Sequence, residues 1–312
     1  MHDPQVGEGA LAGLRRMAPP DFDRYRAALA QAPAQAACWQ HYLPFLHFHY
    51  GPNPRQDLLI EEHEGALCLF KLDRREDPPQ LRLFCLPLPA GTAALRHCLE
   101  RVRAFNGQPR VAIDWMPAAQ IGALGPLGET LRLVPKLDQY LYDPKLYRHL
   151  TGRKTRELRH NLAHVQALEG VEVQAYTPQD APEAEALLAT WIAQQRAKYD
   201  TIAYQGYTRA CLRHDGLFGP RELAGKVVRV QGRLCAFGFA GEIRPGLANL
   251  FITYSDPGVS GLNRFLTCQL LQAFEDCELV NSGPADTPGL VTAKDSLCPV
   301  AMQQVFRVTI GA

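Results

Sequence analysis

Residues 225–243 constrain the fold of this chain more than any other segment. The sequence GKVVRVQGRLCAFGFAGEI alternates strand-forming residues, turns at Gln-Gly and ends in a more apolar run. This pattern predicts an antiparallel β-hairpin whose second strand is the more buried one. A strand (ANLFITYSD), a helix capped by Ser260 (SGLNRFLTCQLLQAFED) and a further strand (CELVNSG) follow. The second half of the chain therefore predicts a sheet with helices packed on it.

The first half follows a similar plan. A helix capped by Asp21 precedes two apolar stretches, DLLIEEHEGALCLFKL and QLRLFCLPLP, which predict consecutive antiparallel strands. A helix that ends at Asn106-Gly107 and the strand RVAIDWM come next. We therefore predict an α/β (α+β) fold with two domains, residues 1–137 and 138–312. Each would be a mixed, mostly antiparallel sheet flanked by helices.

Composition indicates a soluble globular protein. The 312 residues are enough for two domains, and 46% hydrophobic with 21% charged residues excludes a disordered chain. The net charge of +1 favours no class of partner. Nine cysteines without a CxxC pair, mostly inside apolar runs, are typical of a reducing compartment. With no signal-peptide pattern and no apolar window of about 20 residues, we expect a cytoplasmic protein without an integral membrane segment.

The stretch from residue 140 to residue 164 is strongly basic. Asp143-Pro144 predicts the start of a short helix, and Thr151-Gly152 interrupts it before a second helix. Apolar residues fall on one side of that second helix and basic residues on the other. The basic side is either a solvated surface or a binding site for phosphates, which the arginine fork fits well. The candidate phosphate-binding residues are Arg153, Lys154, Arg156, Arg159 and His160.

Three histidines lie in the aromatic segment WQHYLPFLHFHYG. On a strand, His47 and His49 would point to one face, as a metal site requires. His41 is the remaining histidine, but no third ligand stands at a convincing spacing. A packed aromatic segment is therefore favoured over a metal site, and we predict no metal.

Four motifs stand in order in the second half of the chain. They are Tyr140-x-Tyr142-Asp143 with Leu150-Thr151-Gly152-Arg153-Lys154 and Arg159-His160-Asn161; Cys235-Ala236-Phe237 through Gly241-Glu242; Leu262-Asn263-Arg264-Phe265; and Val280-Asn281-Ser282-Gly283 with Asp286, Gly289-Leu290, Ala293-Lys294 and Pro299. In this order they resemble the family represented by the C-terminal domain of phosphatidylglycerol lysyltransferases, a branch of the acetyltransferase-like (GNAT) folds. The resemblance covers most of residues 137–306 and, more loosely, the first half.

The resemblance implies tandem GNAT-like domains that use aminoacyl-tRNA as co-substrate, with no other cofactor. Such chemistry needs a cationic surface for tRNA, carboxylates for the aminoacyl ammonium and a polarising group near the carbonyl. The basic helix would bind the tRNA. The resemblance assigns Asp286 and Lys294 to catalysis, and Glu242, Asn281 and Asn263 to substrate binding. Each also has a structural alternative as a turn, cap, strand-end or surface residue.

Three departures from the family pattern bear on the acceptor. Ala285 replaces the first acid of an acidic pair, the loop from Asp286 to Leu290 is short, and Val291 stands where the family has an arginine. These departures, with no membrane-embedded half present, favour the amine or hydroxyl of a soluble small molecule over a lipid acceptor.

Three alternatives to aminoacyl transfer remain. An acyl-CoA-dependent N-acyltransferase would need a pyrophosphate-binding loop at a helix N-terminus, for which residues 255–261, SDPGVSG, are a poor match. A non-catalytic RNA-binding protein could keep the same fold. Cysteine catalysis, with Cys298 as the nearest candidate, would need a thiolate beside a base.

Overall fold

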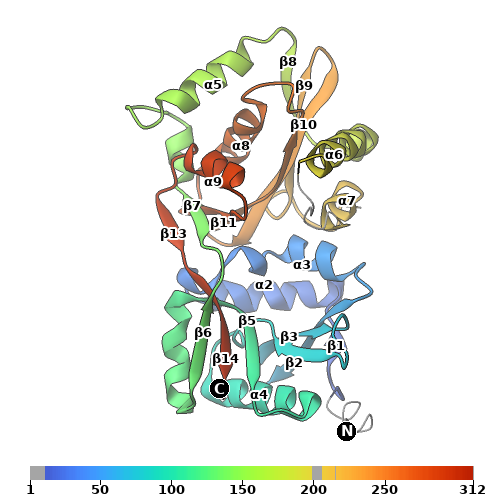
Figure 1. Cartoon of the computed structure of the whole chain (residues 1–312), viewed down its shortest axis with the longest axis vertical. Coiled ribbons are helices and arrows are strands. Elements are labelled where there is room, and N and C mark those ends of the chain that lie inside the picture. The colour runs from blue at the N-terminus through green and yellow to red at the C-terminus, as the bar shows by residue number, and fades with distance from the viewer. Residues whose placement is uncertain (1–10, 199–205, 215, 312) are drawn as a thin grey trace. The chain divides into compact units, whose positions relative to one another are not determined.

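The computed structural model describes residues 11–198, 206–214 and 216–311 (Figure 1). The chain forms two compact units that part between Asp138 and Gln139. The first unit also takes in the last segment, from Gln303, whereas Tyr42–Phe48 belongs to the second unit. Each unit contains a seven-stranded sheet flanked by helices, so the predicted α/β class with two mixed sheets is confirmed.

The first sheet has β4 and β5 as parallel neighbours, and its other pairs are antiparallel. Helix α4 (Thr92–Asn106) connects these two strands and buries Leu95, Leu99 and Val102 against the sheet. Gly107, with φ 63°, ends α4 as predicted. In spatial order the strands are β1 (Arg15–Arg16), β2 (Gln56–His63), β3 (Ala66–Asp73), β4 (Gln80–Leu83), β5 (Val111–Pro117), β14 (Val305–Ile310) and β6 (Leu131–Pro135).

Shorter elements complete the first unit and lead into the second. Asp21 closes the 3-10 turn η1 (Pro19–Asp21) by accepting a hydrogen bond from the Ala18 amide (2.9 Å), and α2 (Phe22–Gln31) follows directly. The segment WQHYLPFLHFHYG forms η3 (Trp39–His41) and helix α3 (Leu43–Tyr50), so the strand on which His47 and His49 would share a face does not form. The remaining 3-10 elements are η2 (Ala34–Ala36) and η4 (Ala118–Leu127).

The second sheet contains the predicted hairpin. Gln231 (φ 51°) and Gly232 (φ 79°) both adopt the left-handed conformation that a tight two-residue hairpin turn requires. Strands β11 and β12 run parallel, and α8 (Leu262–Gln272) connects them. The spatial order is β13 (Ala301–Gln303), β7 (Gln139–Tyr142), β12 (Leu279–Pro284), β11 (Leu247–Ser255), β10 (Arg233–Arg244), β9 (Ala224–Val230) and β8 (Val171–Ala175).

Helices cover both faces of the second sheet. α8 and α5 (Arg156–Gln166) pack together on one face, and α6 (Ala181–Arg196) lies on the other (Figure 1). Ser260 does not cap α8, because the helix begins one residue later, after Gly261. Gly261 has φ 78°, which glycine adopts most easily. The remaining elements are η5 (Pro144–Tyr147), η6 (Pro178–Asp180), α7 (Gly206–Leu212) and α9 (Pro288–Asp295).

The two sheets have the same strand plan and exchange one strand. Each sheet has one strand inserted between the second strand of its parallel pair and an edge strand. These flanking strands are β5 and β6 in the first sheet, and β12 and β13 in the second. That inserted strand is β14 in the first sheet and β7 in the second. The final strand, predicted as part of the domain formed by residues 138–312, therefore lies in the first sheet. Pairing between strands so distant in sequence leaves no local signature.

Candidate active site

The second sheet opens where β11 and β12 separate. Their parallel pairing ends at Asn249 and Asn281, which lie opposite each other and are fully buried. Asn281 donates a hydrogen bond from Nδ2 to Oε1 of Gln139 (2.7 Å), and its Oδ1 accepts one from the Gly283 amide (2.8 Å). Asn281, a predicted substrate-binding residue, thus ties β12 to β7 at the mouth of this opening.

Lys294 lies on α9 and holds the end of β12. Its Nζ donates to the carbonyl oxygens of Ser282 (2.6 Å), Gly283 (2.9 Å) and Pro284 (2.9 Å). Three acceptors match the three N–H groups of an ammonium, whereas a neutral amine has only two. Burial lowers the pKa of Lys294 to about 7, and the Asp286 carboxylate acts in the opposite direction. The three contacts form a clamp on the loop that carries Asp286.

Asp286 is exposed at the end of this loop, directly before α9. The N-cap of α9 is Thr287, whose Oγ1 accepts a hydrogen bond from the Leu290 amide (3.3 Å), so the helix start is satisfied without Asp286. The Asp286 carboxylate makes no hydrogen bond or ion pair with any residue that the structure describes. Burial and, as a smaller cause, the charge of Asp286 raise the pKa of Tyr207 on α7. Asp286, Lys294 and Tyr207 are therefore close enough to interact electrostatically.

Tyr207 was not singled out from the sequence. Its ring stacks on Phe251 of β11, with centroids 5.6 Å apart, and it also contacts Phe45 of α3. Side chains alternate between the faces of a strand, so Asn249 and Phe251 point to the same face. Asn281, paired with Asn249, shares that face. The candidate active site thus combines Asp286, Lys294 and Asn281 with an aromatic wall.

Glu242 lies on the other face of the sheet. It pairs with Ala248, one residue before Asn249 in β11, and Ala248 belongs to the core beneath α8. Its carboxylate forms an ion pair with Arg221, which also contacts Asp276 (3.0 Å). The structure therefore does not group Glu242 with Asp286 and Asn281, and Glu242 has a structural partner of its own.

Asn263 lies in the first turn of α8 and is exposed. Helix α8 covers the face opposite to Asn281. The predicted substrate-binding role of Asn263 therefore has no support from its position, and the residue is not grouped with the clamp and Asp286.

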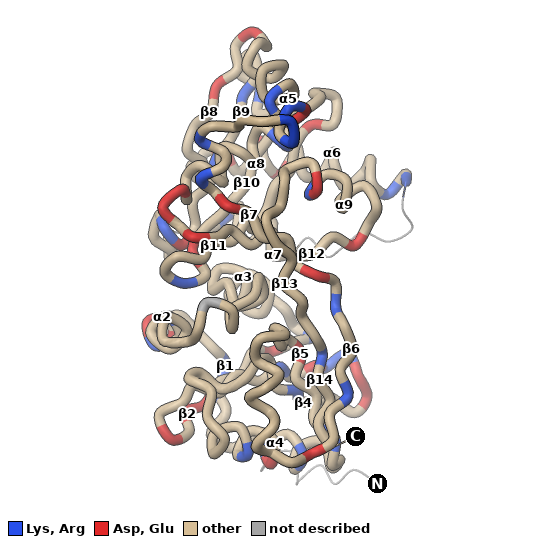
Figure 2. The backbone as a smooth tube through the Cα atoms, turned by 90° about the vertical axis from the view of Figure 1, so that its left-hand side faces the viewer, with Lys and Arg blue, Asp and Glu red and all other residues tan. Residues whose placement is uncertain are grey.

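The predicted phosphate-binding residues lie on and before α5 (Figure 2). Leu158 and Val165 are buried, as the helical pattern predicts. Arg153, Lys154, Arg156 and His160 are exposed, and their side chains form no ion pair with any residue in the described ranges. Arg159 differs, because its Nη1 donates to the Gly152 carbonyl (2.9 Å) and to Thr155 Oγ1 (2.7 Å). Arg159 therefore also shapes the loop that precedes α5.

The loop before α8 carries its own carboxylate. Asp256 accepts a hydrogen bond from the Gly258 amide (2.9 Å) and pairs with Arg233 (2.9 Å). The hydrogen bond from Gly258 and the neighbouring Arg233 lower the pKa of Asp256, which remains charged. A Cβ atom on Gly261 would lie 3.3 Å from the Asn161 carbonyl of α5, so the helix start is closely covered. A pyrophosphate at the start of α8 would be repelled by the Asp256 carboxylate and would be hindered by the Asn161 carbonyl beside Gly261.

The histidines and Cys298 show no catalytic or metal-binding arrangement. On helix α3, His47 and His49 are two residues apart and point to different sides. His41 is buried and its Nδ1 contacts the Cys38 amide (2.9 Å), and burial lowers the pKa of His41 to about 4. Burial also raises the pKa of Cys298, which opposes thiolate formation. The described ranges contain no group of three or more His, Cys, Asp or Glu side chains arranged to hold a metal ion.

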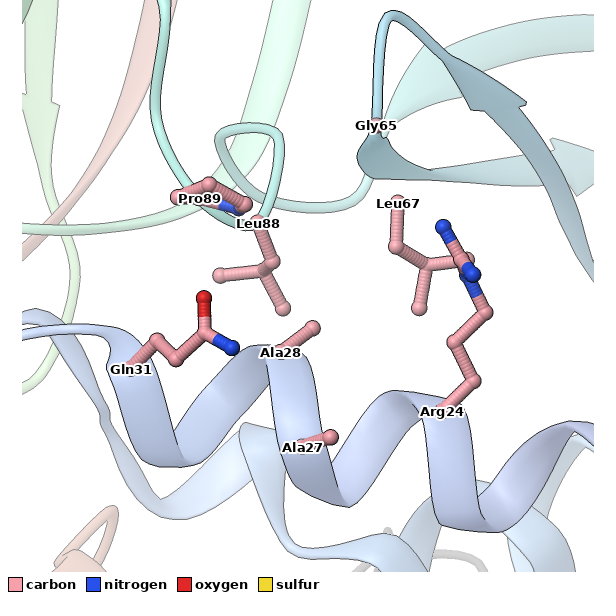
Figure 3. A pocket seen from close by; sticks show the side chains of 8 residues that line it. All are labelled: Arg24, Ala27, Ala28, Gln31, Gly65, Leu67, Leu88 and Pro89. Carbon is pink, nitrogen blue, oxygen red and sulfur yellow. The ribbon is translucent and has the colours of Figure 1, made fainter.

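A small pocket lies in the first unit, apart from these residues. It has a volume of about 200 Å³ and lies between α2 and the β2–β3 turn (Figure 3). Arg24 is its one charged lining residue, and Arg24 already pairs with Glu62 (2.6 Å). The pocket therefore offers little for catalysis. Within the described ranges, no helix is long and apolar enough to cross a membrane.

Comparison with known proteins identifies a family and a fold for this chain. The family described as "Phosphatidylglycerol lysyltransferase, C-terminal" matches residues 92–309. A conserved protein of unknown function from Bacteroides thetaiotaomicron is similar in structure, with a TM-score of 0.78, 16% identity, and coverage of 95% of this chain and 99% of that one. A search of curated proteins gives no match.

Two further solved structures have the same fold. One is L-PGS from Bacillus licheniformis, with a TM-score of 0.63, 14% identity, and coverage of 93% of this chain and 92% of that one. The other is FemX, with a TM-score of 0.66, 8% identity, and coverage of 94% and 96%. At these identities the likeness establishes the fold alone.

Proposed function

Because the chain belongs to the family of phosphatidylglycerol lysyltransferase C-terminal domains, we propose that it transfers an amino acid from aminoacyl-tRNA to an amine or hydroxyl group. Its GNAT-like fold and its family make it a transferase. The acceptor nitrogen or oxygen attacks the ester carbonyl. A new amide or ester bond forms, the ester bond to the terminal ribose breaks, and the acceptor proton ends on the ribose hydroxyl.

The observation that carries this proposal is the position of Asp286. Its exposed carboxylate has no hydrogen-bond or ion-pair partner in the described ranges and follows a loop that Lys294 holds in place. An aminoacyl group differs from an acetyl group by its α-ammonium, which such a carboxylate binds. Asp286 would therefore orient the aminoacyl ester beside the opening between β11 and β12.

Lys294 has a different role in this scheme from the one predicted by the resemblance. All three N–H groups of its ammonium are directed to backbone carbonyls, so polarising a substrate carbonyl would require one of these bonds to break. We assign Lys294 as a positioning residue that fixes the loop before Asp286. Asn281, which tethers the same strand to Gln139, supports the other side of the loop.

The exposed cations at the start of α5 suit the tRNA. Arg153, Lys154 and Arg156 are free to contact phosphates, and the loss of counterions from RNA would drive the binding. Arg159 would contribute by shaping the loop before them. The aminoacyl-tRNA serves as co-substrate, and the mechanism uses no covalent enzyme intermediate.

The acyl-CoA alternative is weaker because of Asp256. An acyl-CoA pyrophosphate needs free amides at a helix N-terminus. Here the Gly258 amide already donates to Asp256, and a second negative charge would repel the pyrophosphate. An RNA-binding protein without activity is the remaining alternative, and it would need no functional carboxylate at Asp286.

The acceptor in this proposal is a soluble small molecule, with a lipid as the alternative. Val291, at the position of the family arginine, is 37% exposed in the first turn of α9. Its isopropyl group offers no charge to a phosphate headgroup. Ala285, at the position of the first family acid, is buried.

Incubation with radiolabelled aminoacyl-tRNA and panels of amines and alcohols tests the proposal. Acceptor-dependent deacylation by the wild-type protein, lost in Asp286→Asn, is the expected result. The Asp295→Asn variant is the matched control, because Asp295 is exposed at the other end of α9. Tight tRNA binding without deacylation of any pool would favour the RNA-binding alternative.

A further inference from the structure

The β-bulge that shapes the candidate active site recurs in the first unit. In the second sheet, Ser282 and Gly283 of β12 lie opposite the single residue Tyr140 of β7, between the pairs Asn281–Leu141 and Pro284–Gln139. A bulge of this kind re-aims the side chains of its strand.

The first sheet has its bulge at the corresponding place. Asp114 and Trp115 of β5 lie opposite the single residue Arg307 of β14, between the pairs Ile113–Val308 and Met116–Phe306. The parallel pairing of β4 and β5 also ends just before it, at Leu83 and Ile113. Asp114 and Trp115 therefore follow the last paired residue of β5, as Ser282 and Gly283 follow Asn281 in the second unit, and the Trp115 amide donates one further hydrogen bond to the Phe84 carbonyl (3.0 Å).

Charged side chains from four strands or strand ends converge on this bulge. Asp114 is fully buried and forms an ion pair with Lys71 of β3, and its other oxygen lies 3.1 Å from Nη2 of Arg307. Lys136, just beyond β6, places its Nζ 3.4 Å from the centre of the Trp115 ring. Neither Nζ of Lys136 nor the buried Nε of Arg307 has a hydrogen-bond partner within residues 11–198, 206–214 and 216–311.

This cluster has two more positive charges than negative ones. Lys71, Lys136 and Arg307 face the single carboxylate of Asp114. The adjacent charges do not correct the excess, because Asp73 and Glu76 are matched by Arg75 and Arg82. Partly buried cations without counter-charge are unfavourable. Burial and the neighbouring cations lower the pKa of Lys136 to about 8, against the attraction of Asp114.

We propose that this cluster in the first unit is a binding site for a phosphate monoester. Two uncompensated positive charges match a phosphate dianion, and the guanidinium of Arg307 offers a fork for its oxygens. The side chain of Arg307 is 40% exposed, which gives a ligand access to the cluster. The half-buried Trp115 ring beside Lys136 provides an apolar wall for the group that carries the phosphate. This inference does not rest on the proposed aminoacyl transfer.

Titration of the full chain with glycerol 3-phosphate, followed by calorimetry and by thermal unfolding, tests the site without any tRNA. The wild-type protein should bind and be stabilised, as any ligand of the folded state stabilises it. Lys136→Gln should weaken binding about tenfold, a typical loss for one charge-assisted contact. Lys136 makes no ion pair in the described ranges, so this variant should fold normally. Arg307→Lys, which keeps the charge and loses the fork, should also weaken binding.

The control is Arg110→Gln. Arg110 is an exposed cation just before the first residue of β5, whereas the bulge lies in the middle of that strand. Equal binding by the wild type, Lys136→Gln and Arg307→Lys would overturn the site. Absence of calorimetric binding by the wild type would do the same. Vesicles of phosphatidylglycerol form a second arm, because a response to vesicles but not to glycerol 3-phosphate would refute a monoester ligand.

Discussion

Replacing Lys294 with methionine removes the clamp on β12 while keeping a side chain of similar length. The three hydrogen bonds from the ammonium to Ser282, Gly283 and Pro284 would be lost. At about 1.5–3 kcal/mol for each hydrogen bond to a charged group, the loss is roughly 4.5–9 kcal/mol. Burial of the charge offsets part of this, because it lowers the pKa from 10.5 to about 7, which corresponds to about 5 kcal/mol. We expect a net loss of ~2 kcal/mol in the free energy of unfolding.

Urea unfolding at pH 6, where Lys294 is mostly protonated, measures this loss. The matched control is Lys226→Met, because Lys226 is also partly buried but its ammonium has no hydrogen-bond partner in the described part of the chain. Lys226→Met should leave the unfolding midpoint unchanged or raise it slightly. If Lys294→Met abolished activity without lowering stability, Lys294 would act on the substrate and the clamp interpretation would be refuted.

Three further predictions follow from the same site. Asp286→Asn should lower kcat/KM for aminoacyl-tRNA by roughly 10- to 100-fold, the value of one charge-assisted hydrogen bond, with unchanged unfolding; a fall no larger than that of Asp295→Asn in steady-state assays would contradict the assigned role. Changing Arg153, Lys154 and Arg156 to Glu should reduce the slope of log K for tRNA binding against log salt by about 2–3, whereas Arg110→Glu should leave it intact; an unaltered slope in filter-binding assays would remove α5 from the interface. Because the pKa of Lys294 is lowered in the folded state, the unfolded chain binds more protons between about pH 7 and 10.5, so the stability of the wild type relative to Lys294→Met should rise across this window; a flat difference in urea midpoints between pH 7 and 9 would count against it.

Local patterns predicted those elements whose pairing is local. The hairpin of β9 and β10 followed from alternation and from Gln231-Gly232, and the end of α4 from Gly107. Helix α3 was not predicted, because its aromatic residues favour strands and tertiary packing outweighs such propensities. The exchange of β7 and β14 between the sheets depends on pairing across more than a hundred residues, which no sequence window contains.

In the candidate site too, local sequence patterns predicted some residues and missed those that depend on tertiary packing. Asn281, Asp286 and Lys294 lie within one short segment, so a single motif could indicate them together. Glu242 was included with them because it ends a motif, yet strand alternation places it on the other face with Arg221. Tyr207 was missed because it joins the site only through packing on Phe251.

The central claim is that this chain uses aminoacyl-tRNA as its acyl donor. The most direct measurement presents radiolabelled aminoacyl-tRNA pools and acetyl-CoA to the same wild-type protein, with one panel of amine and alcohol acceptors. We predict acceptor-dependent release of the amino acid from at least one tRNA pool, with its label recovered on the acceptor and no consumption of acetyl-CoA. Consumption of acetyl-CoA while every tRNA pool remains charged would contradict the account.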